Sequence, residues 1–291
     1  MTVPARPTPL FADIADVSRR LAETGYLPDT ATATAVFLAA RLGKPLLVEG
    51  PAGVGKTELA RAVAQATGSG LVRLQCYEGV DEARALYEWN HAKQILRIQA
   101  GSGDWEATKT DVFSEEFLLQ RPLLTAIRRT EPTVLLIDET DKADIEIEGL
   151  LLEVLSDFAV TVPELGTLTA TRAPFVLLTS NATRELSEAL KRRCLYLHID
   201  FPTPELERRI LLSRVPELPE HFAEELVRII GVLRGMQLKK VPSIAETIDW
   251  GRTVLALGLD TIDDAVVAAT LGVVLKHQSD QQRATGELRL N

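Results

Sequence analysis

The chain has 291 residues, of which 46% are hydrophobic, so it is long enough to bury a sizeable core in one large or two modest domains. Its formal net charge of −9 and isoelectric point near 5.1 disfavour a nucleic-acid partner, because an acidic surface repels the phosphate backbone. A membrane helix needs about 18 consecutive apolar residues, and the sequence contains no such run. The N-terminus also lacks the apolar core of a signal peptide, so we expect a cytoplasmic protein.

Cysteine and histidine residues give no sign of a metal site or a disulfide framework. Cys76 and Cys194 lie far apart in the chain, and we expect both to be buried thiols. The four histidines are scattered without a metal-ligand spacing. Both residue types are therefore assigned to packing or to the surface.

Two helices are predicted before the first strand. The segment from Leu10 to Thr24 has apolar residues at spacings of three and four, which is typical of an amphipathic helix. Residues 30–42 predict a second helix, with Asp29 as its N-cap and Gly43 at its end. The apolar run over residues 45–49 then predicts a short buried strand.

A complete phosphate-loop motif lies between this strand and an Ala-rich helix. Its glycines allow consecutive peptide N–H groups to turn toward phosphate oxygens, because no Cβ obstructs them. Lys56 adds a positive charge for the β- and γ-phosphates, and the Thr57 hydroxyl is a candidate ligand for Mg²⁺. The motif therefore predicts nucleoside-triphosphate binding. The predicted binding residues are Gly50, Pro51, Ala52, Gly53, Val54, Gly55, Lys56, Thr57 and Glu58.

The next part of the chain continues the alternation of strands and helices. After two glycines, residues 71–75 predict a second strand, and residues 81–89 predict a helix. The glycine-containing residues 101–104 interrupt the segment that follows. Residues 90–113 are therefore interpreted as an exposed, mobile insertion.

Alternating helical and strand patterns continue to residue 199 and predict an α/β fold. The continuous apolar run over residues 133–138 is typical of a parallel strand covered on both faces. The other predicted elements are helices over 122–130 and 145–158, a hairpin over 160–171, and strands over 175–179 and 195–199.

The clearest boundary in the chain is the segment 201–204, where two prolines exclude regular pairing. We predict an α/β nucleotide-binding domain over residues 1–202 and a small all-helical domain over residues 203–291. Helical periodicity continues over 205–214, 219–235, 243–257 and 260–277.

Polar side chains at the ends of two predicted strands complete the candidate site. Asp138 is assigned to Mg²⁺, and Glu139 to the base that orients the attacking water. Asn181 is assigned to the γ-phosphate or to that water, although an isolated Asn is more often a turn former. Arg192 and Arg193 belong to a basic cluster, which is either a solvated surface or the completion of a neighbouring subunit's phosphate site.

In this order, the motifs resemble the AAA+ ATPases over about residues 25–290. More narrowly, residues 74–79, 86–90 and 242–250 are similar to the CoxD-like members of the MoxR branch. The resemblance implies an ATP hydrolase that uses Mg²⁺. It also implies a parallel five-stranded sheet flanked by helices, with a helical lid and with insertions at 90–113 and 159–171.

The same resemblance implies partners for the chain. Members of this branch look like homo-oligomeric rings, commonly hexamers, that mature a client metalloenzyme such as a molybdenum hydroxylase. A partner with a von Willebrand factor A domain often takes part. One position departs from the family pattern, because residues 242–246 contain no arginine at the start of a lid helix. Arg252 lies further along the chain.

Two other functions remain as alternatives. The first is a scaffold that binds a nucleotide for assembly without obligatory turnover. The second is a nucleic-acid-acting AAA+ motor, which the acidic composition disfavours. A GTPase motif read from residues 141–144 is interpreted as a coincidence, because the segment follows the Asp138 strand directly and lacks Asn.

Overall fold

The structure is a computed structural model that describes residues 10–100, 111–259 and 261–288. The chain divides into two compact units. The first contains the residues up to His198, except Gly25–Leu27 and Gly50–Lys56. Those two segments belong to the second unit, together with the residues from Ile199 onward. The domain boundary after residue 202 stays a prediction.

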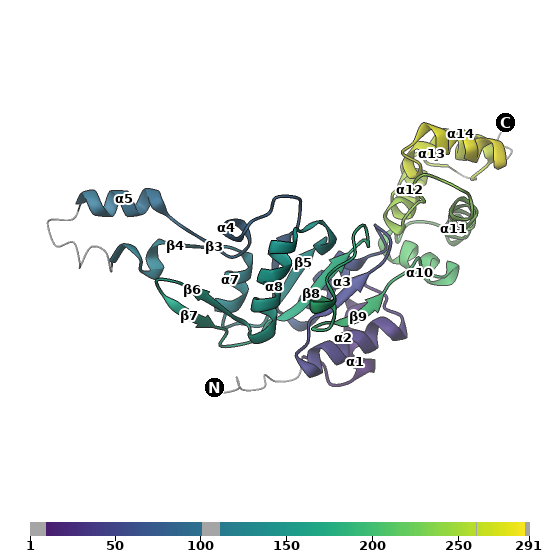
Figure 1. The fold of residues 1–291 in the computed structure, drawn as a ribbon. Coiled ribbons are helices and arrows are strands. Elements are labelled where there is room, and N and C mark those ends of the chain that lie inside the picture. The colour runs from purple at the N-terminus through teal and green to yellow at the C-terminus, as the bar shows by residue number, and fades with distance from the viewer. Residues whose placement is uncertain (1–9, 101–110, 260, 289–291) are drawn as a thin grey trace. The chain divides into compact units, whose positions relative to one another are not determined.

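A five-stranded parallel sheet forms the centre of the first unit, as predicted (Figure 1). Its strand order is β2-β5-β8-β1-β9. The two strands β5 and β8 are buried along their whole length, which accounts for their continuous apolar sequences. The strands are β1 (Leu46–Glu49), β2 (Gly70–Gln75), β5 (Thr133–Asp138), β8 (Phe175–Ser180) and β9 (Leu195–His198).

Helices connect the parallel strands, because each crossover between such strands needs a long connection. Helix α2, which precedes β1, packs against β1 and β9, whereas α7, on the connection from β2 to β5, packs against β2 and β5. The helices of this unit include α1 (Ile14–Glu23), α2 (Thr30–Leu42), α3 (Lys56–Thr67), α7 (Pro122–Arg128), α8 (Ile145–Asp157) and the short α9 (Glu188–Lys191).

Capping side chains explain where the first two helices begin. The carboxylate of Asp13 accepts a hydrogen bond from the backbone N–H of Asp16, so α1 begins at Ile14 and not at Leu10. The side chain of Asp29 caps α2 in the same way, as predicted. That helix ends as predicted at Gly43, whose φ of 64° is accessible to glycine without strain.

The prediction of a helix over residues 81–89 is wrong in its second half. Helix α4 (Glu82–Ala85) is a single turn, and β3 (Tyr87–Trp89) pairs antiparallel with β4 (Leu118–Gln120). Aromatic residues favour strands, and the ring of Trp89 packs edge-on against that of Phe113, with 5.4 Å between the ring centroids.

Two insertions extend from the same side of the first unit (Figure 1). One consists of β3, β4 and α5 (His91–Ala100), and η1 (Glu115–Phe117) precedes β4. The other is the predicted hairpin, formed by β6 (Ala159–Val162) and β7 (Gly166–Thr169). Residues 101–110 of the predicted insertion lie outside the described residues.

Among the described residues after 203, the second unit contains five helices around their own apolar core. Trp250 is fully buried there, and its indole Nε1–H donates to the Thr270 hydroxyl at 2.8 Å. The helices are α10 (Pro204–Arg214), α11 (Glu220–Gly235), α12 (Ile244–Ala256), α13 (Asp264–Val274) and α14 (Gln278–Glu287), of which α14 was not predicted as a separate helix. Within the ranges that the structure describes, no helix is both long and apolar enough to cross a membrane.

A buried ion pair joins α10, α11 and α12. Glu207 is 2% exposed, and its carboxylate receives two hydrogen bonds from the guanidinium of Arg234, at 2.5 and 2.8 Å. The Thr247 hydroxyl donates a third bond at 2.7 Å. Removing one partner of such a pair leaves the other charge buried without compensation.

We therefore expect Arg234→Ala to lower the free energy of unfolding of this unit by about 3–5 kcal/mol. The matched control is Arg228→Ala on the same helix, which breaks an exposed pair with Glu225 and costs no more than about 1 kcal/mol. Denaturant unfolding of both variants measures the difference. Equal losses of stability would contradict this assignment.

Candidate active site

The carboxyl ends of the parallel strands bring the predicted polar residues to one edge of the sheet. The register pairs Gln75 of β2 with Asp138 of β5. It also pairs Val48 of β1 with Thr179 of β8. In open α/β sheets, this edge is where ligands bind.

Three glycines of the phosphate loop, Gly50, Gly53 and Gly55, have a positive φ, and at the first two a Cβ would also have no room. Gly50 has a φ of 151°, and a Cβ there would overlap the carbonyl oxygen of Ile199. Gly53 has a φ of 77°, and a Cβ there would overlap the Ser243 side chain. Substitution at either position is thus opposed by both conformation and space. The loop and these two neighbours all belong to the second unit.

Lys56 is turned back onto the loop that precedes it. Its side chain is buried, and the ammonium Nζ donates to the carbonyl oxygens of Gly50 at 2.6 Å and Pro51 at 2.7 Å. Phosphate oxygens can replace these two carbonyl oxygens as acceptors for the ammonium group, because a charged acceptor makes a stronger hydrogen bond with a compact cation. The loop therefore fits a polyphosphate ligand.

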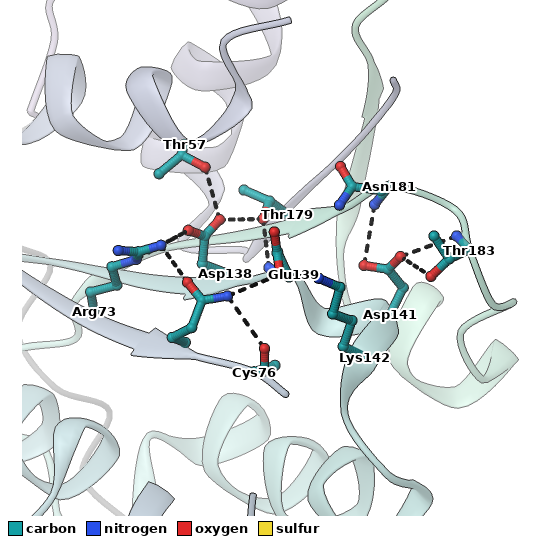
Figure 2. A network of polar contacts seen from close by, with 11 residues as sticks. Thr57, Arg73, Cys76, Asp138, Glu139, Asp141, Lys142, Thr179, Asn181 and Thr183 are labelled. Carbon is teal, nitrogen blue, oxygen red and sulfur yellow. Dashed lines mark hydrogen bonds and ion pairs between the residues drawn. The ribbon is translucent and has the colours of Figure 1, made fainter. Parts of the chain in front are cut away.

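Asp138 is the last residue of β5 and is only 2% exposed. Its Oδ1 accepts hydrogen bonds from the hydroxyls of Thr57 at 2.9 Å and Thr179 at 2.6 Å (Figure 2). Thr57 lies in the first turn of α3 and Thr179 in β8. A buried carboxylate is costly without such donors, so this network fixes three elements relative to one another.

The second oxygen of Asp138 is held by Arg73 of β2, which was not among the predicted site residues. Its Nε and Nη2 donate to Oδ2 of Asp138 at 3.0 and 2.5 Å. The same guanidinium bonds the side-chain oxygen of Gln75. The sequence did contain one signal for Arg73, which is its position as a cation within a short, mostly apolar strand. A charged side chain in such a strand needs an oppositely charged partner.

Glu139 follows Asp138 in a left-handed conformation, with a φ of 56°, which is unfavourable for a residue with a side chain. The hydroxyl of Thr179 accepts a hydrogen bond from the Glu139 backbone N–H at 2.8 Å. The carboxylate Oε2 accepts from Lys142 at 2.6 Å and from Gln75 at 3.1 Å. This pairing with Glu139 raises the pKa of the Lys142 ammonium.

Asn181 follows β8 directly, and its backbone N–H donates to Oδ1 of Asp141 at 3.2 Å. Asp141 was not among the predicted site residues, and its only signal was its place three residues after Asp138. Its carboxylate faces the loop after β8 (Figure 2).

The two candidate arginines differ in their surroundings. Arg193 donates from Nε to the Ser156 hydroxyl at 2.8 Å, and from Nη1 to the Ala189 carbonyl at 3.1 Å. Arg192 is exposed at the end of α9, and its side chain has no hydrogen bond or ion pair to the described residues. Either cation is accessible to a second molecule.

The predicted Mg²⁺ ligands fit this ion. Mg²⁺ is typically bound through one or two carboxylates together with substrate phosphates and water. The Thr57 hydroxyl and the Asp138 carboxylate present oxygens that lie 2.9 Å apart. No cluster of three or more His, Cys, Asp or Glu residues capable of binding a metal occurs in the part of the chain that the structure describes.

Helix α12 begins with a capping box, at the place where the family pattern has an arginine and this sequence has none. Ser243 donates to the Glu246 carboxylate, which also accepts the Ser243 backbone N–H at 3.0 Å and lies 3.3 Å from Lys240. Arg252 pairs instead with Asp249 at 3.3 Å. The Ser243 side chain occupies the space that a Cβ at Gly53 would need.

A family model described as AAA domain (dynein-related subfamily) matches residues 45–194. The chain belongs to this AAA family. The matched span contains the phosphate loop, Asp138, Glu139 and Asn181. The predicted membership of the AAA+ ATPases is therefore confirmed at the level of the family.

Curated relatives of this AAA protein include ClpB chaperones. The chaperone protein ClpB 1 of Synechocystis sp. is 27% identical over 236 residues, which cover 76% of this chain and 23% of the relative. The chaperone protein ClpB 2 of Thermosynechococcus vestitus is 33% identical over 143 residues, which cover 48% of this chain and 14% of the relative. The chain thus spans less than a quarter of the length of these two relatives.

A solved structure of a RuvB mutant from Thermotoga maritima has a similar fold. Its TM-score is 0.51 at 19% sequence identity, and the match covers 92% of this chain and 73% of that chain. At this identity the likeness concerns the fold alone.

The two cysteines of the AAA protein are free thiols, and only Cys76 is fully buried. Cys194 is half-buried, so the expectation of two buried thiols is confirmed for Cys76 and only in part for Cys194. Burial raises the pKa of both thiols to about 12, and the charge of Asp138 adds to the effect at Cys76. At pH 8 the thiolate fraction is then about 10⁻⁴.

We expect neither cysteine to react with a thiol reagent at pH 8 in the folded protein, because the thiolate is the nucleophile. Both should react after unfolding in denaturant, which is the internal control. The measurement is reagent release with time. Rapid labelling of Cys76 in the folded protein would show that the strand ends are open to solvent.

Proposed function

We propose that this AAA protein hydrolyses ATP, with the phosphate loop and the Asp138–Glu139 turn acting on one bound nucleotide. The hydrogen bond between the hydroxyl of Thr57 and the carboxylate of Asp138 carries the proposal. It joins the last residue of the loop motif to the predicted metal ligand. The same carboxylate is linked through Thr179 to the backbone of Glu139.

Each residue of the site then has a role. The loop N–H groups and the ammonium of Lys56 bind the β- and γ-phosphates. Thr57 and Asp138 hold Mg²⁺, which neutralises phosphate charge when bound. The carboxylate of Glu139 orients the attacking water and accepts its proton. Asn181 donates a hydrogen bond to the γ-phosphate or to that water.

A ring of identical subunits, commonly six, would complete the site with a cation from the adjacent copy. Arg192 and Arg193 are exposed cations that can neutralise charge left uncovered by Lys56. Arg192 is favoured for this role, because its side chain is exposed and has no partner among the described residues. Arg193 stays an alternative, because its own bonds to a hydroxyl and a carbonyl are replaceable.

We further propose that the protein is a MoxR-type chaperone of the CoxD-like branch in the cytoplasm. Its client would be a metalloenzyme, such as a molybdenum hydroxylase, and its partner would contain a von Willebrand factor A domain. The sequence resemblance at residues 74–79, 86–90 and 242–250 supports this narrower assignment. The ClpB relatives are chaperone proteins, which supports action on protein clients.

The second candidate is a nucleotide-dependent assembly scaffold without obligatory turnover. The pairing of Glu139 with Lys142 at 2.6 Å favours it, because a base held in this way must be released before it can accept a proton. Measuring phosphate release with and without candidate clients and DNA separates the proposals. DNA-stimulated, salt-sensitive turnover would instead favour the nucleic-acid motor.

Replacing Glu139 with Gln should lower ATP hydrolysis by about 10²- to 10⁴-fold, because the amide cannot accept the water proton. Binding of ATP should be retained, since the loop and Asp138 are unchanged. The matched control is Glu146→Gln, an exposed residue in the first turn of α8. Phosphate release and nucleotide titration measure the two effects, and undiminished turnover of the Glu139 variant would contradict the assigned base.

Mixing two inactive variants tests the role of the neighbouring subunit. Glu139→Gln subunits retain the arginines, and Arg192→Ala/Arg193→Ala subunits retain the base. Mixed rings should therefore recover part of the turnover at interfaces that combine the two intact halves. The single variants identify which arginine acts. If mixed rings assemble and no turnover returns, the shared site is wrong.

A further inference from the structure

The loop that carries Asn181 is tied to the turn that carries Glu139 by a buried carboxylate. Asp141 lies in η2 (Thr140–Lys142), directly after Glu139, and is 3% exposed. Its Oδ1 accepts the Asn181 backbone N–H at 3.2 Å. Its Oδ2 accepts from Thr183 twice, from the backbone N–H at 3.0 Å and from the hydroxyl at 2.5 Å (Figure 2).

The loop after β8 contains an unfavourable backbone conformation, which the hydrogen bonds around it stabilise. Ala182 has a φ of 55°, in the left-handed region that residues with a side chain disfavour. Its N–H donates to the Ser180 hydroxyl at 3.0 Å, which in turn donates to Glu49 at 3.2 Å. The backbone N–H groups of Asn181, Ala182 and Thr183 are thus all hydrogen-bonded.

A second buried carboxylate fastens the far end of the same loop. Glu148 of α8 is 2% exposed and accepts the Ser187 backbone N–H at 2.9 Å. It also pairs with Arg184 at 2.6 Å. Asp141 is therefore the carboxylate that contacts the part of the loop nearest to Asn181, and Glu148 the one that contacts its end.

Asp141 is ionised in this setting. Burial by itself raises its pKa, but the hydrogen bonds from Thr183 and Asn181 outweigh burial, and the pKa lies below its usual range. A charged acceptor makes stronger hydrogen bonds than a neutral one. The backbone direction at Asn181 is consequently well defined.

We propose that Asp141 is a positioning residue for ATP hydrolysis, which holds Asn181 at a fixed place relative to Glu139. The inference rests on the proposed function, because it assumes that Asn181 and Glu139 act on one nucleotide. Asp141 acts in this proposal through its hydrogen bonds to the loop after β8. Its effect passes through the Asn181 backbone, and a small displacement of a catalytic group can cost about 10²-fold in rate.

The test is a double-mutant cycle between Asp141→Asn and Asn181→Ala in the full chain. The amide that the first substitution introduces keeps the shape of the carboxylate but replaces one acceptor oxygen by a donor, so at least one of the bonds from Thr183 or Asn181 is lost. We expect kcat to fall by about 10²-fold, while the affinity for ATP changes little. In the Asn181→Ala background the same substitution should have no further effect on kcat.

Two more variants keep the test decisive. Thr183→Val removes one hydroxyl donor and leaves Asp141 intact, so it should lower kcat less and again be silent in the Asn181→Ala background. It replaces Asp141→Asn in the cycle if that variant does not fold. Asp144→Asn, at an exposed carboxylate three residues further on, is the matched control and should leave kcat unchanged.

The outcomes separate this inference from the proposed function. Rate losses that multiply in the double mutant would show that Asp141 acts independently of Asn181, and would overturn the positioning role. An Asp141→Asn variant with wild-type kcat would do the same while the proposed function stands. Absence of turnover in the wild-type ring, with and without clients, would overturn both.

Discussion

The buried carboxylate of Asp138 is the interaction on which the rest of the site depends. Its two oxygens receive hydrogen bonds from Thr57, Thr179 and Arg73, which lie on α3, β8 and β2. Because an uncompensated buried charge is costly, the sheet must bring all three donors together. The strand ends are thereby fixed in the register that also positions Glu139.

The sequence could predict the parts of this site that obey local rules. The residues of the phosphate-loop motif have a fixed spacing. Neighbouring atoms leave no room for a side chain at Gly50 and Gly53, so glycine is needed at both positions. The strands that end at Asp138 and Ser180 are continuous apolar runs, so the polar residues after them mark the ligand-binding edge. Capping residues such as Asp29 likewise specify a helix start from a few neighbouring positions.

What could not be predicted depends on contacts between residues far apart in the chain. The pairs Arg73–Asp138 and Asp141–Asn181 leave no periodic pattern, because each joins two strands or loops only after the sheet has formed. The helix predicted over residues 81–89 failed for a related reason. Tyr87 and Trp89 are strand residues through pairing with β4, which lies some thirty residues further on.

The most direct test of the central claim is the effect of Mg²⁺ on ATP binding by the wild type and by Asp138→Asn. Titration with a fluorescent ATP analogue, in Mg²⁺ or in a chelator, gives the two affinities. The wild type should bind more tightly with Mg²⁺, and the variant should lose this increment while still binding through the loop. An unchanged Mg²⁺ increment in the variant would contradict the place of Asp138 at the centre of the site.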